Sequence, residues 1–154
     1  MPFIKGNLLS SKMEQKAENQ LLLDTIPVYL RAADVLTLIS SGVVNSSYLA
    51  ALKNLTNFSD EIISNWLNIN VKTYRSYKKP KTAIKADIQE HTVMLLALMK
   101  HGIEVFGSNE ELEKWLQAEN FQLGKTKPID YLNTISGIKF IDDRLTGMEY
   151  GDNA

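Results

Sequence analysis

Residues 59–79 read SDEIISNWLNINVKTYRSYKK, and their order predicts two short helices joined by a tight turn. Ser59 is a favoured helix N-cap, and the two acidic residues that follow it suit the positive end of the helix dipole. Asn68 tolerates the left-handed conformation and is expected to end the first helix, whereas Asn70 can cap the second. This arrangement is typical of a helix-turn-helix.

The second helix of this pair carries basic and hydroxyl side chains on its outward face. No acidic residue occurs between Val71 and Ala86. Cationic side chains meet DNA phosphates, and short polar side chains reach base edges in a groove. We therefore predict DNA contacts from Lys72, Thr73, Arg75, Ser76, Lys78 and Lys79. The alternative is a solvated, lysine-rich face on an ordinary helix pair.

Length and composition bound the class of protein. The chain has 154 residues, of which 44% are hydrophobic, enough for one domain or two small ones. It contains no cysteine, which excludes disulfides and thiolate metal sites and fits a reducing compartment. The start lacks the apolar region of a signal peptide, and no apolar run is long enough to span a bilayer. We expect a soluble, cytoplasmic protein with no membrane contact.

Charge is distributed unevenly along the chain, although the net charge is only −1. Through Lys100, 12 Lys and Arg stand against 8 Asp and Glu, and beyond it the tally is 5 against 10. The basic excess centres on the second helix of the motif. Such an asymmetry indicates two functions on one chain, although surface charge also drifts by chance.

Apolar spacing predicts helices along the rest of the chain, and no stretch shows the alternation of a strand. Residues 1–15 are polar and irregular and are expected to form a loose arm. The expected helices outside the pair cover residues 14–24, 28–40, 46–55 with Ser46 or Ser47 as cap, 83–106, 108–116, a further one from Pro128 and a last one after Thr134. The predicted fold class is therefore all-α.

The long helix over residues 83–106 contains an apolar run from Val93 to Met99 that covers its whole circumference. Such a run must be buried on every side. A dimer contact and a central position within the monomer explain it equally well.

Catalytic and metal-binding patterns are missing from the sequence. The two histidines, His91 and His101, lie on different faces of one helix and are expected to be surface or helix-packing residues. Asp142 and Asp143 are adjacent on a helix and are interpreted as a solvated face. No glycine-rich phosphate loop or nucleophile elbow occurs. We predict no enzyme activity, no metal and no cofactor.

The C-terminal third carries residues whose order and spacing resemble a known family. They are Phe106, Gly107, Trp115, Leu116, Leu123, Gly124, Pro128, Tyr131, Leu132, Gly137, Leu145 and Glu149 to Gly151. This set is similar to the toxin-binding domain of the Xre/ParS-type antitoxins, the partners of RES-domain toxins. With the preceding helix-turn-helix, the resemblance covers residues 40–151. Two positions depart from the family pattern: Lys125 replaces the second of two glycines, and Gly147 replaces a basic residue.

The resemblance implies an antitoxin with two partners, a toxin and operator DNA. The toxin would be an enzyme that degrades NAD, and this chain would occlude its active site and repress its own operon. A homodimer would read a near-palindromic operator. We assign residues 1–40 to an N-terminal arm and helices, 41–106 to the Xre-like helix-turn-helix domain with its long connecting helix, and 107–154 to the toxin-binding domain. The alternative is a dimeric helix-turn-helix regulator with no toxin partner.

The last helix is expected to bury one stripe and to present its end to the toxin. The expected inner stripe is Ile138, Ile141, Leu145 and Met148. Arg144 and the segment Gly147 to Gly151 are then left to face a partner, with glycines that let the backbone extend past the helix. We predict toxin contacts from Arg144, Met148, Glu149, Tyr150 and Gly151, with Tyr150 as the anchor. The alternative is a frayed terminus that contacts nothing.

Overall fold

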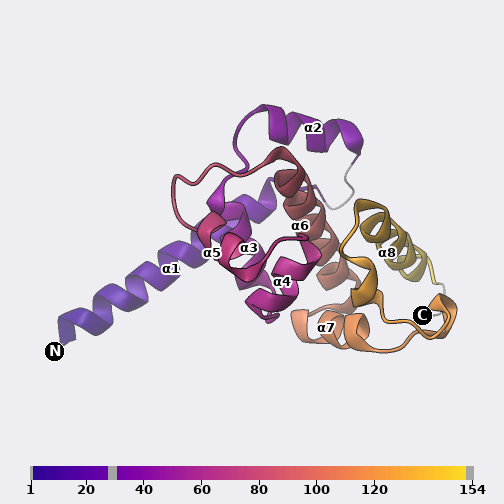
Figure 1. Ribbon diagram of the computed structural model, residues 1–154. Helices are drawn as coiled ribbons and strands as arrows, with labels where there is room; N and C mark the ends of the chain where they lie inside the picture. Colours follow the sequence, from indigo (N-terminus) through magenta and orange to yellow (C-terminus); the bar gives the residue numbers. More distant parts are fainter. Residues whose placement is uncertain (1, 28–30, 152–154) are drawn as a thin grey trace.

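A computed structural model describes residues 2–27 and 31–151, and its regular elements are helical (Figure 1). This part of the chain contains no β-strand, only an isolated bridge between Asn120 and Thr126. The α-helices are α1 (Pro2–Asp24), α2 (Ala32–Ser40), α3 (Ser46–Leu55), α4 (Asp60–Trp66), α5 (Val71–Tyr77), α6 (Ala86–Phe106), α7 (Asn109–Gln117) and α8 (Ile135–Glu149). Two 3-10 turns, η1 (Phe121–Leu123) and η2 (Pro128–Tyr131), join α7 to α8. The predicted all-α class is confirmed.

Helix α1 corrects the expectation of a loose N-terminal arm. The helix runs without a break from Pro2, because its middle is rich in unbranched Lys, Met, Glu and Gln side chains and Ala, all good helix formers. These side chains give no apolar stripe, and the helix projects from the body of the molecule (Figure 1). Its C-terminal end is held by Lys100, whose Nζ donates to the carbonyls of Leu23 and Ile26 at 2.8 Å each.

The next two helices differ from expectation only at their starts. Helix α2 begins at Ala32 rather than at residue 28, and residues 28–30 lie outside the described chain. It stops before Gly42, which takes a left-handed φ of +74°. Helix α3 is capped by Asn45, whose side chain accepts from the Ser47 backbone N–H, and not by either predicted serine. Asn ranks with serine as an N-cap, so the sequence allowed both choices.

Helix α6 is the central element and lies between α3 on one side and α8 on the other (Figure 1). It begins at Ala86 instead of residue 83, because the chain after Pro80 first makes a turn in which Lys81 has a φ of +65°. Every residue from His91 to Met99 is buried within the single chain. The apolar run is therefore explained by a central position in the monomer and gives no reason to expect a dimer.

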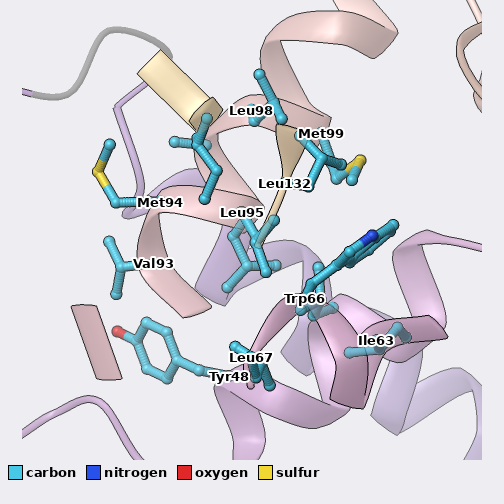
Figure 2. Close-up of a cluster of buried hydrophobic side chains, with 14 of the residues drawn as sticks. Tyr48, Ile63, Trp66, Leu67, Val93, Met94, Leu95, Leu98, Met99 and Leu132 are labelled. Atoms are coloured by element: carbon cyan, nitrogen blue, oxygen red, sulfur yellow. The ribbon is translucent and has the colours of Figure 1, made fainter. Parts of the chain in front are cut away.

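One hydrophobic core surrounds α6 and joins the two halves of the chain. Figure 2 shows Val93, Leu95 and Met99 of α6 gathered with Trp66 of α4 and Leu132, which precedes α8. The core is continuous across the assigned boundary at residue 107. The described residues therefore form no separate cores on the two sides of residue 107, and the assignment of residues 41–106 and 107–154 to two functions stays a prediction.

The C-terminal elements begin and end largely where expected. Gly107 ends α6 with a φ of +86°, Ser108 caps α7, and Thr134 caps α8 by accepting from the Gly137 N–H at 2.9 Å. Pro128 starts a 3-10 turn and not an α-helix. No helix within residues 2–27 and 31–151 has the length and apolar character needed to cross a membrane.

Candidate functional site

Helices α4 and α5 form the predicted helix pair with the predicted local chemistry. Ser59 Oγ accepts from the Ile62 N–H at 3.3 Å, and Asn70 Oδ1 accepts from the Thr73 N–H at 2.7 Å. Asn68 has a φ of +57°, so it makes the turn in the left-handed conformation expected of it. The backbone of the pair is thus specified by three local polar residues.

The inner surface of the pair is closely packed. Ile63 and Tyr74 are fully buried, and Ser64 is buried as expected for a small residue where the helices approach. Burial raises the pKa of the Tyr74 hydroxyl well above its ordinary value, with a further contribution from the charge of Asp60. The pair therefore presents α5 from a rigid base.

The six predicted DNA-contacting residues all lie on α5 or directly after it, but they are not equivalent. Lys72, Arg75, Ser76 and Lys79 are exposed, whereas Thr73 and Lys78 are partly buried. The α5 face carries no acid of its own. It nevertheless receives negative charge from the first turn of α4, which the sequence pattern did not indicate.

Asp60 is the centre of an ion-pair network on this surface. Its carboxylate lies 3.0 Å from Arg75 Nε, 3.4 Å from Lys78 Nζ and 3.3 Å from Lys53 Nζ. The hydrogen bond from Arg75 is the main cause that lowers the Asp60 pKa to about 2. Glu61 adds a longer contact of 3.7 Å to Arg75. Phosphates must therefore compete with Asp60 for two of the six residues, and Lys72 and Lys79 are in no ion pair among the described residues.

The predicted toxin-contacting residues at the end of α8 divide into packed and exposed groups. Met148 packs against the core, and Arg144 is partly buried. Glu149 is exposed, and its carboxylate lies 3.0 Å from His101 Nε2, so its contact with a partner stays a prediction. Tyr150 is 83% exposed, and Gly151 is exposed with a φ of +94°. Of the five predicted toxin-contacting residues, Glu149, Tyr150 and Gly151 are the exposed ones.

The backbone at this end also differs from expectation. Helix α8 continues through Gly147 to Glu149, and the Tyr150 N–H still bonds to the Thr146 and Gly147 carbonyls. Gly147 therefore does not release the chain from the helix. Only beyond Tyr150 does a glycine break the helical path.

A buried cluster that sequence reasoning missed fixes this end of α8. His101 is fully buried on α6, with Nδ1 2.7 Å from Asp142 and Nε2 3.0 Å from Glu149. The two acids are seven residues apart and so share one face of α8. The interpretation of Asp142 as a solvated residue was wrong, and burial raises the pKa of its carboxyl.

The second histidine is a packing residue. His91 is buried, and its Nε2 lies 2.8 Å from the Leu132 carbonyl oxygen. Burial lowers the pKa of His91. Of the two alternatives expected for the histidines, a surface or a helix-packing position, both residues take the second. No cluster of three potential metal ligands occurs in the described ranges, and the acids around His101 approach opposite nitrogens of the ring.

Replacing His101 with leucine is expected to loosen the last turn of α8. The variant keeps an apolar side chain in the core but removes the hydrogen bond with Asp142, which as a bond to a charged group contributes about 1.5–3 kcal/mol, and the contact with Glu149. Amide hydrogen exchange should accelerate by roughly 10-fold or more in residues 146–151 and stay slow in the core of α6. Glu104→Gln, an exposed change on α6, is the control. Unchanged exchange in the last turn would show that His101 does not hold it.

The two candidate surfaces are connected through the body of the protein. The Asn68 side-chain amide in the turn of the helix pair donates to the Asn133 carbonyl oxygen at 2.8 Å, just before α8. Helix α6 packs against both α3 and α8. The α5 surface and the end of α8 thus belong to one packed framework.

Comparison with known protein families gives a match over the part of the chain that ends with α8. Residues 101–151 match the model of the family described as "Antitoxin Xre/MbcA/ParS C-terminal toxin-binding domain". The match begins at His101 and takes in the end of α6 and all the elements through α8. No curated protein matches the chain significantly. The family match supports an antitoxin role, suggests a non-enzymatic regulator and implies a toxin as binding partner.

Proposed function

We propose that this protein is the antitoxin of a type II toxin–antitoxin system that inhibits a RES-type, NAD-degrading toxin and represses its own operon. The observation that carries the proposal is the match of residues 101–151 to an antitoxin toxin-binding domain. The helix pair supplies a basic, hydroxyl-rich face for operator DNA. The two surfaces agree with the charge asymmetry of the chain.

Inhibition is assigned to the end of α8. Tyr150 projects from a helix end held by the His101 contacts, and an aromatic ring with a hydroxyl suits a partly polar cleft. Gly151 then lets the chain turn without steric cost. Arg144 and Met148 support this end from the helix. Occlusion of the toxin's dinucleotide site by this segment is the mechanism that we propose.

Repression is assigned to α5. Lys72 and Lys79 supply phosphate contacts directly, and Thr73 and Ser76 are candidates for base edges. Arg75 and Lys78 also contact phosphates, after their ion pairs with Asp60 are broken. We further propose a homodimer that reads two half-sites about one helical turn apart in a near-palindromic operator.

The double change Lys72→Ala with Lys79→Ala is expected to weaken operator binding and to flatten its salt dependence. Each lost phosphate contact removes roughly 0.9 from the log–log slope, so the two together should remove about 1.8. Fluorescence anisotropy over a range of salt concentrations measures this slope.

The control for this measurement is Lys114→Ala, an exposed lysine of α7 paired with Glu111. Its slope should equal that of the wild type. An unchanged slope in the double variant would place the DNA surface elsewhere on the protein.

Co-expression tests the antitoxin role itself. The reading frame adjacent to this protein's gene should be toxic when expressed alone and harmless when this protein is present. A harmless neighbour, or one that stays lethal in the presence of this protein, would contradict the proposed function.

A further inference from the structure

Three aromatic side chains are exposed in the C-terminal part of the described chain. Phe121 is 84% exposed, Phe140 44% and Tyr150 83%. All three lie within the stretch 101–151 that matches the toxin-binding domain. The other large exposed apolar residues described are aliphatic and lie before it: Leu9, Met13, Leu21, Leu36 and Val43. Aromatic residues are enriched at protein interfaces, so their restriction to this segment indicates a binding surface.

Phe121 is presented by a closed loop. The Asn120 N–H donates to the Thr126 carbonyl at 3.0 Å, and the Lys125 N–H donates to the Asn120 carbonyl at 2.9 Å. The side chain of Asn120, itself buried, caps η1. Leu123 anchors the loop in the core. The exposed ring of Phe121 is therefore held in place by its backbone, with Lys125 Nζ 5.5 Å from its centre.

The same loop is joined to Phe140 through Tyr131. Thr126 Oγ1 lies 2.9 Å from the Tyr131 hydroxyl, and the rings of Tyr131 and Phe140 are 5.4 Å apart between centres. These contacts link the loop to η2 and α8. We therefore group Phe121, Tyr131 and Phe140 and call them the aromatic surface.

The surroundings of the aromatic surface favour a protein partner. Its neighbours in sequence carry exposed charges of both signs: Lys125, Lys127, Asp130, Lys139 and Asp143. An apolar centre with a mixed polar rim is the common composition of protein interfaces. A nucleic acid would require a predominantly basic surface. The side of α8 that carries Phe140 also leads to Tyr150, ten residues on and about 80° around the helix.

We propose that the aromatic surface is a docking site for the toxin, separate from the inhibitory end of α8, and that it inserts Phe121 into an apolar pocket on the toxin. This inference rests on the proposed function and divides it between two contacts. The aromatic surface supplies most of the affinity, and Tyr150 blocks the active site. Rigid aromatic anchors commonly dominate the binding energy of an interface.

The test is the affinity of the purified full-length protein for the purified toxin, measured by isothermal titration calorimetry. Phe121→Ser is expected to weaken binding by about 30-fold or more, which is the range of an aromatic hot spot. Phe121→Ser with Phe140→Ser should weaken it further. Phe121 is 84% exposed, so thermal unfolding of the single variant should stay close to wild type. The double variant also loses the contact of Phe140 with Tyr131 and should unfold at a slightly lower temperature. Leu36→Ser, an exposed apolar change on α2, is the matched control and should bind as the wild type does.

The outcomes separate the inference from the function on which it rests. Equal affinity of the wild type and of both phenylalanine variants would overturn the aromatic surface and leave the antitoxin role intact. Absence of toxin binding by the wild type would overturn the antitoxin role, and the inference with it. The other possible occupant of the aromatic surface is a second copy of this chain, and sedimentation velocity tests for it. If Phe121→Ser abolishes a dimer without changing toxin affinity, the surface joins two copies of this chain and the proposal is wrong.

Discussion

Gly137→Ala is expected to destabilise the protein by about 3 kcal/mol or more, the upper range for overpacking in a core. A Cβ atom at Gly137 would lie 1.8 Å from the Tyr131 carbonyl oxygen and 2.8 Å from Thr134 Oγ1. The first of these is a backbone atom, so no rotamer change relieves the clash. Displacing it would disturb the contact of the Tyr131 ring with Phe140 and the contact of the Leu132 carbonyl with His91.

Thermal unfolding measures this loss, which corresponds to a fall in Tm of roughly 6–12 °C for a chain of this size. Ser136→Ala, an exposed change on the preceding residue, is the control and should change the free energy of unfolding by less than about 0.5 kcal/mol. A Gly137→Ala protein as stable as the wild type would mean that η2 does not pack on α8 this closely.

Ending the chain at Glu149 is expected to abolish inhibition of the toxin while leaving a folded protein. The cut removes Tyr150, whose side chain is exposed, but keeps the packing of Met148 and the contact of Glu149 with His101. Because Tyr150 is assigned to blocking the active site and not to docking, the truncated protein should still bind the toxin but should leave it active even at saturating amounts. Tyr150→Ala should reproduce most of this effect. An activity assay of the toxin with increasing amounts of each protein measures it.

The control for this truncation is Phe121→Ser. It should also require more protein to inhibit, but inhibition should become complete at saturation because Tyr150 remains. Full inhibition by the truncated protein at wild-type concentrations would show that the inhibitory surface lies further back, between Trp115 and Tyr131.

Local signals explain which parts of the fold were predictable. Ser59, Asn68 and Asn70 act within three residues of themselves, and each adopts the expected cap or turn. Gly107 and Thr134 likewise mark helix ends through local backbone chemistry. Such signals are readable in a single sequence because partner and residue are neighbours in the chain.

Long-range contacts explain what was missed. Asp60 lies 15 positions before Arg75, and His101 lies 41 positions before Asp142. No periodicity connects residues so far apart. The ion pairs of Asp60 with the basic residues of the α5 surface, and the contacts of His101 with the acids of α8, were therefore not predictable. The helix over residues 14–24 was predicted, but its extension back to Pro2 was missed for a different reason, because that part has helix-forming residues but no regular apolar stripe to reveal its period.

One departure from the family pattern has a structural explanation. Lys125 replaces the second glycine of a pair, and it takes a left-handed φ of +65° directly after Gly124 at +67°. Glycine is favoured at both positions because the loop requires this conformation twice. The lysine accepts a strained backbone and places its ammonium group beside Phe121.

We propose that this protein holds an NAD-degrading toxin inactive through residues 101–151. The most direct test follows the loss of NAD catalysed by the purified partner toxin as this protein is added. NAD consumption is predicted to fall to background at a fixed molar ratio of the two proteins. Consumption at the full rate in the presence of saturating amounts of this protein would contradict the claim.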